Sequence, residues 1–154
     1  MTPKYRAWDN GMEMMVYQGD DEIYICFDGE KWKLLDYYRT HWETDEYGMN
    51  EIEQPWEVEN IEIMQYTGLK DSNGVEIYEG DIVTTKQASL NGSRVHFIEA
   101  KGEVKFSDCN FYILQTDNVI DPLENYSVGF ENVLTEIITI GNIYENPELL
   151  EVEQ

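Results

Sequence analysis

An Asp-Gly pair between two apolar runs is the feature that most constrains how this 154-residue chain folds. Asp28-Gly29 lies between the runs at residues 23–27 and 31–35. Asp and Gly both tolerate the positive φ angles of a tight turn, so the pattern predicts a β-hairpin. Short apolar runs recur along the rest of the chain at intervals of about 8–12 residues, which indicates a mainly β fold, a small barrel or a sandwich.

Further strands are predicted where β-branched and aromatic residues alternate with polar residues or fill a short run. They are expected at residues 14–17, 61–66, 75–78, 81–85, 94–98, 102–106, 111–114 and 135–144. Gly141, inside the last run, predicts a bulge or a tight bend. Helical signals are scarce, and Asn146 followed by Pro147 predicts a single terminal turn.

The stretch from residue 35 to residue 57 lacks such periodicity and is polar and rich in aromatic residues. We expect it to form a long loop or insertion. Its large rings stand beside carboxylates, and such a surface can imitate the charge and stacking of nucleic acid in the groove of a DNA-binding protein. The alternative is an acidic exterior with aromatic side chains packed beneath it. The candidate protein-binding residues are Trp42, Glu43, Asp45, Glu46, Trp56 and Glu57.

The charge of the chain excludes several classes of partner. Asp and Glu number 32 against ten Lys and Arg, so the formal net charge is −22. Proteins that bind phosphate backbones or anionic membranes use basic side chains, and we therefore expect neither direct nucleic-acid binding nor membrane association. The charge is −10 over residues 1–60, −3 over residues 61–110 and −9 over residues 111–154. This distribution favours the interpretation that the fold does not depend on the acidic residues.

Few residues suit catalysis or metal binding. The chain has two histidines and two cysteines, Cys26 and Cys109, and it lacks the common hydrolase, zinc and phosphate-loop motifs. We expect no enzymatic activity, no cofactor and no metal site. The longest apolar run has five residues, whereas a spanning helix needs about 20. With no secretory signal evident, we expect a cytoplasmic protein with reduced thiols.

Four segments carry a resemblance to a known family. They are YRAWD at residues 5–9, MQYTGLKDSNGVEIYEGDIV at 64–83, GEVKF at 102–106 and IGNIYENPELL at 140–150. In this order they resemble the YopX family of phage and prophage proteins over almost the whole chain. The resemblance implies a phage or prophage origin, a cytoplasmic location in the bacterial host cell and a mainly β fold that contains an SH3-like barrel. It brings no catalytic residues to this chain.

These observations together predict one YopX-like domain over residues 1–150. An N-terminal β region with a long loop covers residues 1–60, an SH3-like barrel core covers residues 61–146, and residues 151–154 form an acidic tail.

We expect a non-enzymatic accessory protein whose acidic face binds a host or phage protein. In a specific form of this function, the acidic face mimics DNA and binds a basic or DNA-binding partner. One alternative is a structural homo-oligomer assembled through exposed tryptophans or a strand edge. Another is a carboxylate-based enzyme or metal protein, which no residue spacing supports.

Overall fold

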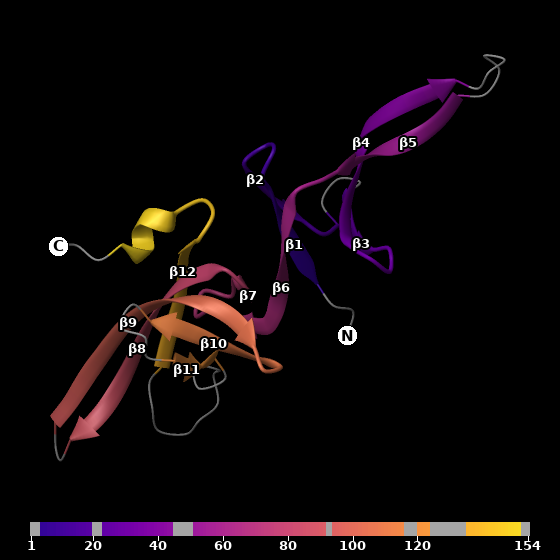
Figure 1. Ribbon diagram of the computed structural model, residues 1–154. Coiled ribbons are helices and arrows are strands. Elements are labelled where there is room, and N and C mark those ends of the chain that lie inside the picture. Colours follow the sequence, from indigo (N-terminus) through magenta and orange to yellow (C-terminus); the bar gives the residue numbers. More distant parts are fainter. Residues whose placement is uncertain are drawn as a thin grey trace. The chain divides into compact units, whose positions relative to one another are not determined.

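The described part of the chain is built mainly from β-strands (Figure 1). The computed structural model describes residues 4–19, 23–44, 51–91, 94–115, 120–123 and 135–151. The chain divides into two compact units, residues 1–65 and residues 66–154, and each is described by itself. Among the described residues, no helix is both long enough and apolar enough to cross a membrane. The predicted mainly β class is confirmed.

Three antiparallel strands form the first sheet of the N-terminal unit. Their order is β2 (Met14–Tyr17), β1 (Tyr5–Asp9) and the first half of β6 (Ile61–Lys70). Arg6 lies opposite Met64 in the β1–β6 register, and its Nε–H donates a hydrogen bond to the Met64 sulfur at 3.4 Å. Both side chains are buried, so this contact links β1 to β6 within the core of the unit.

The predicted Asp28-Gly29 hairpin is confirmed. It joins β3 (Ile23–Phe27) to β4 (Trp32–Thr44), which pair in antiparallel register. Asp28 Oδ1 accepts the backbone N–H groups of Glu30 and Lys31, each at 2.9 Å. The aspartate therefore closes the turn with its own side chain, as short polar residues do at many turns.

The expectation of a long loop over residues 35–57 is wrong for the described part of that stretch. β4 continues to Thr44, and β5 (Glu51–Val58) returns beside it in the sheet order β3-β4-β5. Residues 45–50 lie outside the described residues. Aromatic and β-branched residues favour extended backbone, and pairing between strands satisfies their backbone groups even where apolar residues do not alternate regularly.

The pairing of β4 with β5 contains an irregularity at a proline. The register shifts between Asp36 and Thr40, and Pro55 lies opposite Thr40. Proline has no N–H to donate, so strands accept it mainly at edges and bulges. β5 is such an edge strand in the three-stranded sheet.

The core of the N-terminal unit is drawn from four strands. Ala7, Val16, Ile25 and Leu34 form a buried cluster. β1 is buried at every residue from Arg6 to Asp9, whereas the other three strands each contribute one core residue from the side chains of their inward face. The partly buried residues packed against the cluster are Tyr5, Ile23, Val58, Ile61 and Ile63.

The second unit contains a five-stranded antiparallel sheet, whose curled form is visible in Figure 1. Its order is β11 (Ile120–Pro122), β10 (Asn110–Gln115), β9 (Arg94–Ser107), β8 (Asp81–Asn91) and β12 (Thr135–Asn142). The short strand β7 (Glu76–Tyr78) pairs with the second half of β6. A curled sheet of this kind is compatible with the predicted SH3-like barrel.

The core of the second unit lies on one face of the five-stranded sheet. The buried cluster consists of Ile77, Val83, Val104, Ile113, Leu123 and Ile137. Val104 lies opposite Ile113 in the β9–β10 register. The core is therefore continuous across neighbouring strands.

The predicted irregularity at Gly141 is confirmed. The β12–β8 register shifts between Thr139 and Gly141. A Cβ atom on Gly141 would lie 2.5 Å from Asn146 Oδ1, so the C-terminal segment packs against this point more closely than any side chain permits. The predicted terminal turn is also present, as the 3-10 helix η2 (Pro147–Leu150).

The edge of β12 is covered by the turn that follows β6. Asp71 is buried, and its Oδ1 accepts the N–H groups of Asn73 at 2.9 Å and Val75 at 2.8 Å. Its Oδ2 accepts the N–H of Thr139 in β12 at 3.1 Å. One carboxylate thus shapes its own turn and fastens that turn to a distant strand.

Ser72 adds two further hydrogen bonds between this turn and β12. Its N–H donates to the Ile137 carbonyl oxygen at 2.8 Å, and its Oγ accepts the Ile137 N–H at 3.1 Å. A side chain and a backbone group together take the place of a neighbouring strand. Unpaired strand edges invite association with other chains, and here the edge is occupied by the protein's own turn.

Several aspartates therefore stabilise the fold, and the interpretation that the fold does not depend on the acidic residues is wrong for them. Asp9, Asp71 and Asp81 are all buried. Asp9 Oδ1 accepts two backbone N–H groups in the turn after β1, and Asp81 Oδ2 accepts the Tyr78 N–H at 2.8 Å. A carboxylate that accepts N–H groups satisfies donors that would otherwise be buried without partners.

Asp71→Ala should destabilise the protein by about 2–4 kcal/mol, because it leaves three backbone N–H groups without their acceptor. Asn73→Ala, in the same turn, is the matched control, since Asn73 is exposed and should cost less than about 0.5 kcal/mol. Urea unfolding followed by circular dichroism measures both. Equal stabilities of the two variants would contradict the assigned role of Asp71.

Candidate protein-binding surface

The structure describes only part of the predicted binding surface. Trp56 and Glu57 lie on β5. The backbone of Trp42 and Glu43 lies on β4, but their side chains fall outside the described part of the chain. Asp45 and Glu46 lie outside the described residues altogether.

Trp56 and Glu57 do not contribute to one surface. Neighbouring residues in a strand point to opposite faces of the sheet. Trp56 lies opposite Asp36 in the β4–β5 register, whereas Glu57 lies opposite Leu35. The Trp56 side chain is 53% exposed, so it presents its ring on one face while Glu57 presents its carboxylate on the other.

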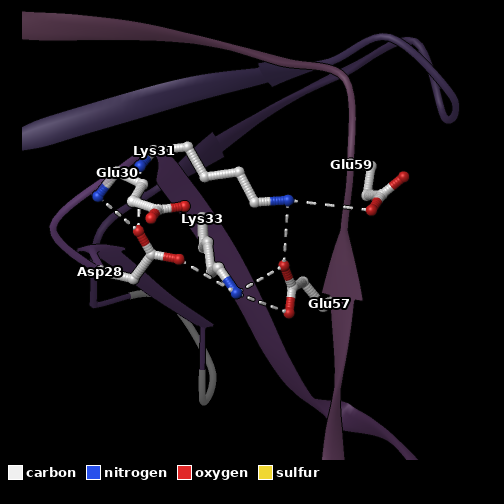
Figure 2. A network of polar contacts seen from close by, with 6 residues as sticks. All are labelled: Asp28, Glu30, Lys31, Lys33, Glu57 and Glu59. Carbon is white, nitrogen blue, oxygen red and sulfur yellow. Dashed lines mark hydrogen bonds and ion pairs between the residues drawn. The ribbon is translucent and has the colours of Figure 1, made fainter.

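Glu57 belongs to a network of charged side chains (Figure 2). Lys33 Nζ lies 2.9 Å from Glu57 Oε1 and 3.2 Å from Asp28 Oδ2, so this ammonium group joins β5 to the hairpin turn. Lys31 Nζ lies 3.6 Å from Glu57 Oε1 and 3.8 Å from Glu59 Oε1. Two lysines thus meet three carboxylates in one connected group.

The network shifts the titration of its members toward their charged forms. The backbone N–H groups of Lys31 and Glu30, with Lys33 nearby, lower the pKa of Asp28 to about 2. The hydrogen bond from Lys33 lowers the pKa of Glu57. The hydrogen bonds to Glu57 and Asp28 raise the pKa of Lys33. All of these groups are charged at neutral pH, and exposed ion pairs of this kind hold geometry more than they add stability.

Two tyrosines occupy the same face of this sheet as Glu57 and Lys33. Tyr24 lies opposite Leu35 in the β3–β4 register, and Tyr37 is two residues beyond Leu35 on β4, so both point to the side that Glu57 faces. Their ring centroids are 5.4 Å apart with an interplanar angle of 80°. Tyr24 is 56% exposed. We call this surface the Tyr24 face, defined by Tyr24, Lys33, Leu35, Tyr37 and Glu57.

Tyr24 and Tyr37 were not among the residues predicted for the binding surface. Two features of the sequence could have predicted that they share a face: the two-residue alternation within each strand and the hairpin register set at Asp28-Gly29. Tyrosines are favoured at protein interfaces because one ring offers both apolar area and a hydroxyl group. The Tyr24 face therefore combines aromatic contact area with fixed charges.

No metal centre is evident among the described residues. Nowhere among them do three His, Cys, Asp or Glu side chains gather as metal ligands do. Cys26 and Cys109 are free thiols, and Cys26 lies opposite Lys33 on the Tyr24 side of the sheet.

Comparisons with known proteins identified a family and a similar solved structure. A family model described as YopX protein matches residues 4–151. The crystal structure of protein EF1440 from Enterococcus faecalis is similar, with a TM-score of 0.56 and 26% sequence identity over 98% of this chain and 99% of that chain. The search of curated proteins gave no match.

The Asp28 turn makes stability depend on pH in the acidic range. A carboxyl group whose folded-state pKa of about 2 lies below its ordinary value of 3.8 stabilises the fold above pH 3.8. This stabilisation is lost as the pH falls toward 2. We expect Asp28→Asn to flatten the dependence of thermal unfolding on pH in that window.

The matched control is Glu30→Gln, because Glu30 contributes to the turn through its backbone N–H and that group is retained. Carbon-detected NMR titration of the Asp28 carboxyl group gives its pKa directly. A measured pKa near 4, or identical pH profiles for Asp28→Asn and the unchanged protein, would rule out the proposed hydrogen bonding.

Proposed function

Because the chain belongs to the YopX protein family, we propose that it is an accessory protein of phage or prophage origin that binds another protein and catalyses no reaction. It acts in the cytoplasm of the bacterial host without a cofactor. Its partner is a basic host or phage protein, and the N-terminal unit supplies the contact. The observation that supports this proposal is that lysines of this unit are paired with carboxylates of the same unit.

The N-terminal unit, residues 1–65, holds 16 acidic and five basic residues, a formal charge of −11. Lys31 and Lys33 are each paired with carboxylates of the same unit. Arg6 is buried. Three of the five basic side chains are thus occupied inside the unit, whereas carboxylates such as Glu13, Glu30 and Glu62 are exposed. A field of this sign attracts a basic partner and raises the rate of encounter.

Mimicry of DNA is the specific form that we favour for this interaction. A protein that binds duplex DNA presents rows of cations to regularly spaced phosphates. Exposed carboxylates can take the place of those phosphates, and the exposed rings of Tyr24 and Tyr37 add apolar area to the unit. Such a partner is expected to release the acidic protein when duplex DNA competes for the same cations.

A structural homo-oligomer is the second candidate, and the exposed aromatic side chains of the N-terminal unit favour it. Phe27 is 54% exposed, close to the value for Trp56. Burial of such side chains between copies of the chain would stabilise an oligomer. Light scattering at high protein concentration tests this candidate, with salt added to screen the repulsion between copies. A strict monomer excludes it.

The proposed function predicts capture of a basic protein from host lysate at low salt, and its release by a short DNA duplex. Glu13→Gln, Glu30→Gln and Glu62→Gln combined should weaken capture about tenfold, because three charges of the attracting surface are removed.

Asp108→Asn, Glu148→Gln and Glu151→Gln combined form the matched control, since these three carboxylates are exposed in the other unit. Quantitative mass spectrometry of the captured protein compares the two triple variants. Retention of no basic protein, or an equal loss with both triple variants, would refute binding through the N-terminal unit.

A further inference from the structure

The second unit contains a local reversal of the charge of the chain. Residues 81–107, which comprise β8, β9 and their connection, hold four basic and three acidic residues and sum to +1. The rest of the chain sums to −23. This reversal has no part in the proposed function, which rests on the acidic N-terminal unit.

An open pocket of about 440 Å³ lies on one side of this region, across strands β12, β8 and β9. Glu136, Lys86 and Glu99 form one row across the three strands. Ile138, Thr84 and Lys101 form the next row. These rows place cations beside carboxylates. A charged group that forms no ion pair with its neighbours can bind a ligand of opposite charge.

Lys101 is the cation that remains available in this pocket. Lys86 Nζ lies 2.8 Å from Glu99 Oε1, and Lys105 Nζ lies 3.1 Å from Glu103 Oε1. Glu99 and Glu103 are the neighbours of Lys101 on its own face of β9, two residues away on either side, and each is already paired with another lysine. Lys101 forms no ion pair with any residue that the structure describes.

The strand that carries Lys101 also has an edge that no described strand pairs. β9 pairs with β8 along residues 94–103, but its pairing with β10 covers only residues 102–107. β10 ends at Gln115, which lies opposite Gly102 of β9. Figure 1 shows β8 and β9 extending together past the end of β10. In the described part of the chain, residues 94–101 of β9 therefore have a strand on one side only, and we call this segment the β9 edge.

The β9 edge displays an apolar side chain on each face. Phe97 is 56% exposed and Ile98 is 57% exposed, and as neighbours in a strand they point to opposite faces. The Lys86 ammonium group lies 5.0 Å from the centre of the Phe97 ring, which keeps that ring beside the pocket. An added strand would find apolar contact on both faces and a free cation at Lys101.

We propose that the β9 edge binds an extended, acidic segment of a partner protein, which adds to the sheet as a strand and places a carboxylate against Lys101. Main-chain hydrogen bonds along residues 94–101 supply affinity, as in other cases of strand addition, and alternate side chains supply specificity. Eight residues of strand span about 26 Å, enough for a recognition segment of five or six residues. The choice of an acidic segment follows from charge complementarity with the Lys101 ammonium group, which no described carboxylate pairs, since Glu99 and Glu103 are each paired with another lysine.

The test uses the full chain labelled with ¹⁵N and a synthetic peptide of alternating Val and Glu, at an ionic strength of about 0.15 M, where charges farther apart than about 8 Å are screened. Chemical shifts should change at the amides of residues 94–101. Hydrogen exchange should slow roughly tenfold, at a free peptide concentration about ten times Kd, for the alternate amides in this segment that point away from β8. A peptide with Lys in place of Glu should leave these amides unchanged, and N-methylation of alternate peptide residues should abolish binding.

Two matched variants separate the charge from the edge. Lys101→Gln should weaken binding of the Val-Glu peptide about two- to fivefold, the range of an exposed ion pair. Lys70→Gln, an exposed lysine of the same unit on β6, should leave the affinity unchanged. Shifts confined to other strands, an affinity insensitive to Lys101→Gln, or binding that survives N-methylation would overturn the proposal. Shifts at residues 94–101 that grow with protein concentration alone would also overturn it, because the occupant would then be a second copy of the chain.

Discussion

The second unit depends on how one buried carboxylate satisfies the backbone of two segments far apart in sequence. Asp71 accepts N–H groups from its own turn and from Thr139 of β12. β12 pairs with β8 on its other side, so this carboxylate and Ser72 occupy the edge that a further strand would otherwise take. The order of the sheet, the shape of the turn and the position of the last strand therefore rest on a few hydrogen bonds. The burial of the acceptor keeps water from competing for them.

The acidity of the chain has two separate physical roles. Aspartates such as Asp71 and Asp81 are buried acceptors for backbone N–H groups, and their short side chains suit turns in which the acceptor lies close to the chain. Exposed glutamates such as Glu13 and Glu62 contribute instead to the negative electrostatic potential around the protein. The same net charge thus contains residues whose loss damages the fold and residues whose loss changes only encounters with other molecules.

Local chemistry made part of the fold predictable. Asp28-Gly29 predicted its hairpin because a two-residue signal determines the turn, and Gly141 predicted an irregularity because a side chain has no room there. Strands within residues 35–57 were missed because pairing with a neighbour, and not periodicity, holds them extended. Trp56 and Glu57 were grouped because they adjoin in sequence, whereas a strand sends them to opposite faces. Tyr24 was missed because its position beside other residues depends on register between strands, which no single segment encodes.

The two exposed edges described above are protected against self-association in different ways. Pro55 lies in the edge strand β5 and offers no N–H there, which discourages another strand from pairing at that point. The β9 edge contains no proline. Copies of this chain repel one another through a formal charge of −22 each, so at low ionic strength the exposed edge of one copy rarely meets that of another. The colloidal stability of the protein is therefore a property of its solvent as well as of its fold, and it declines as dissolved ions shorten the range of that repulsion.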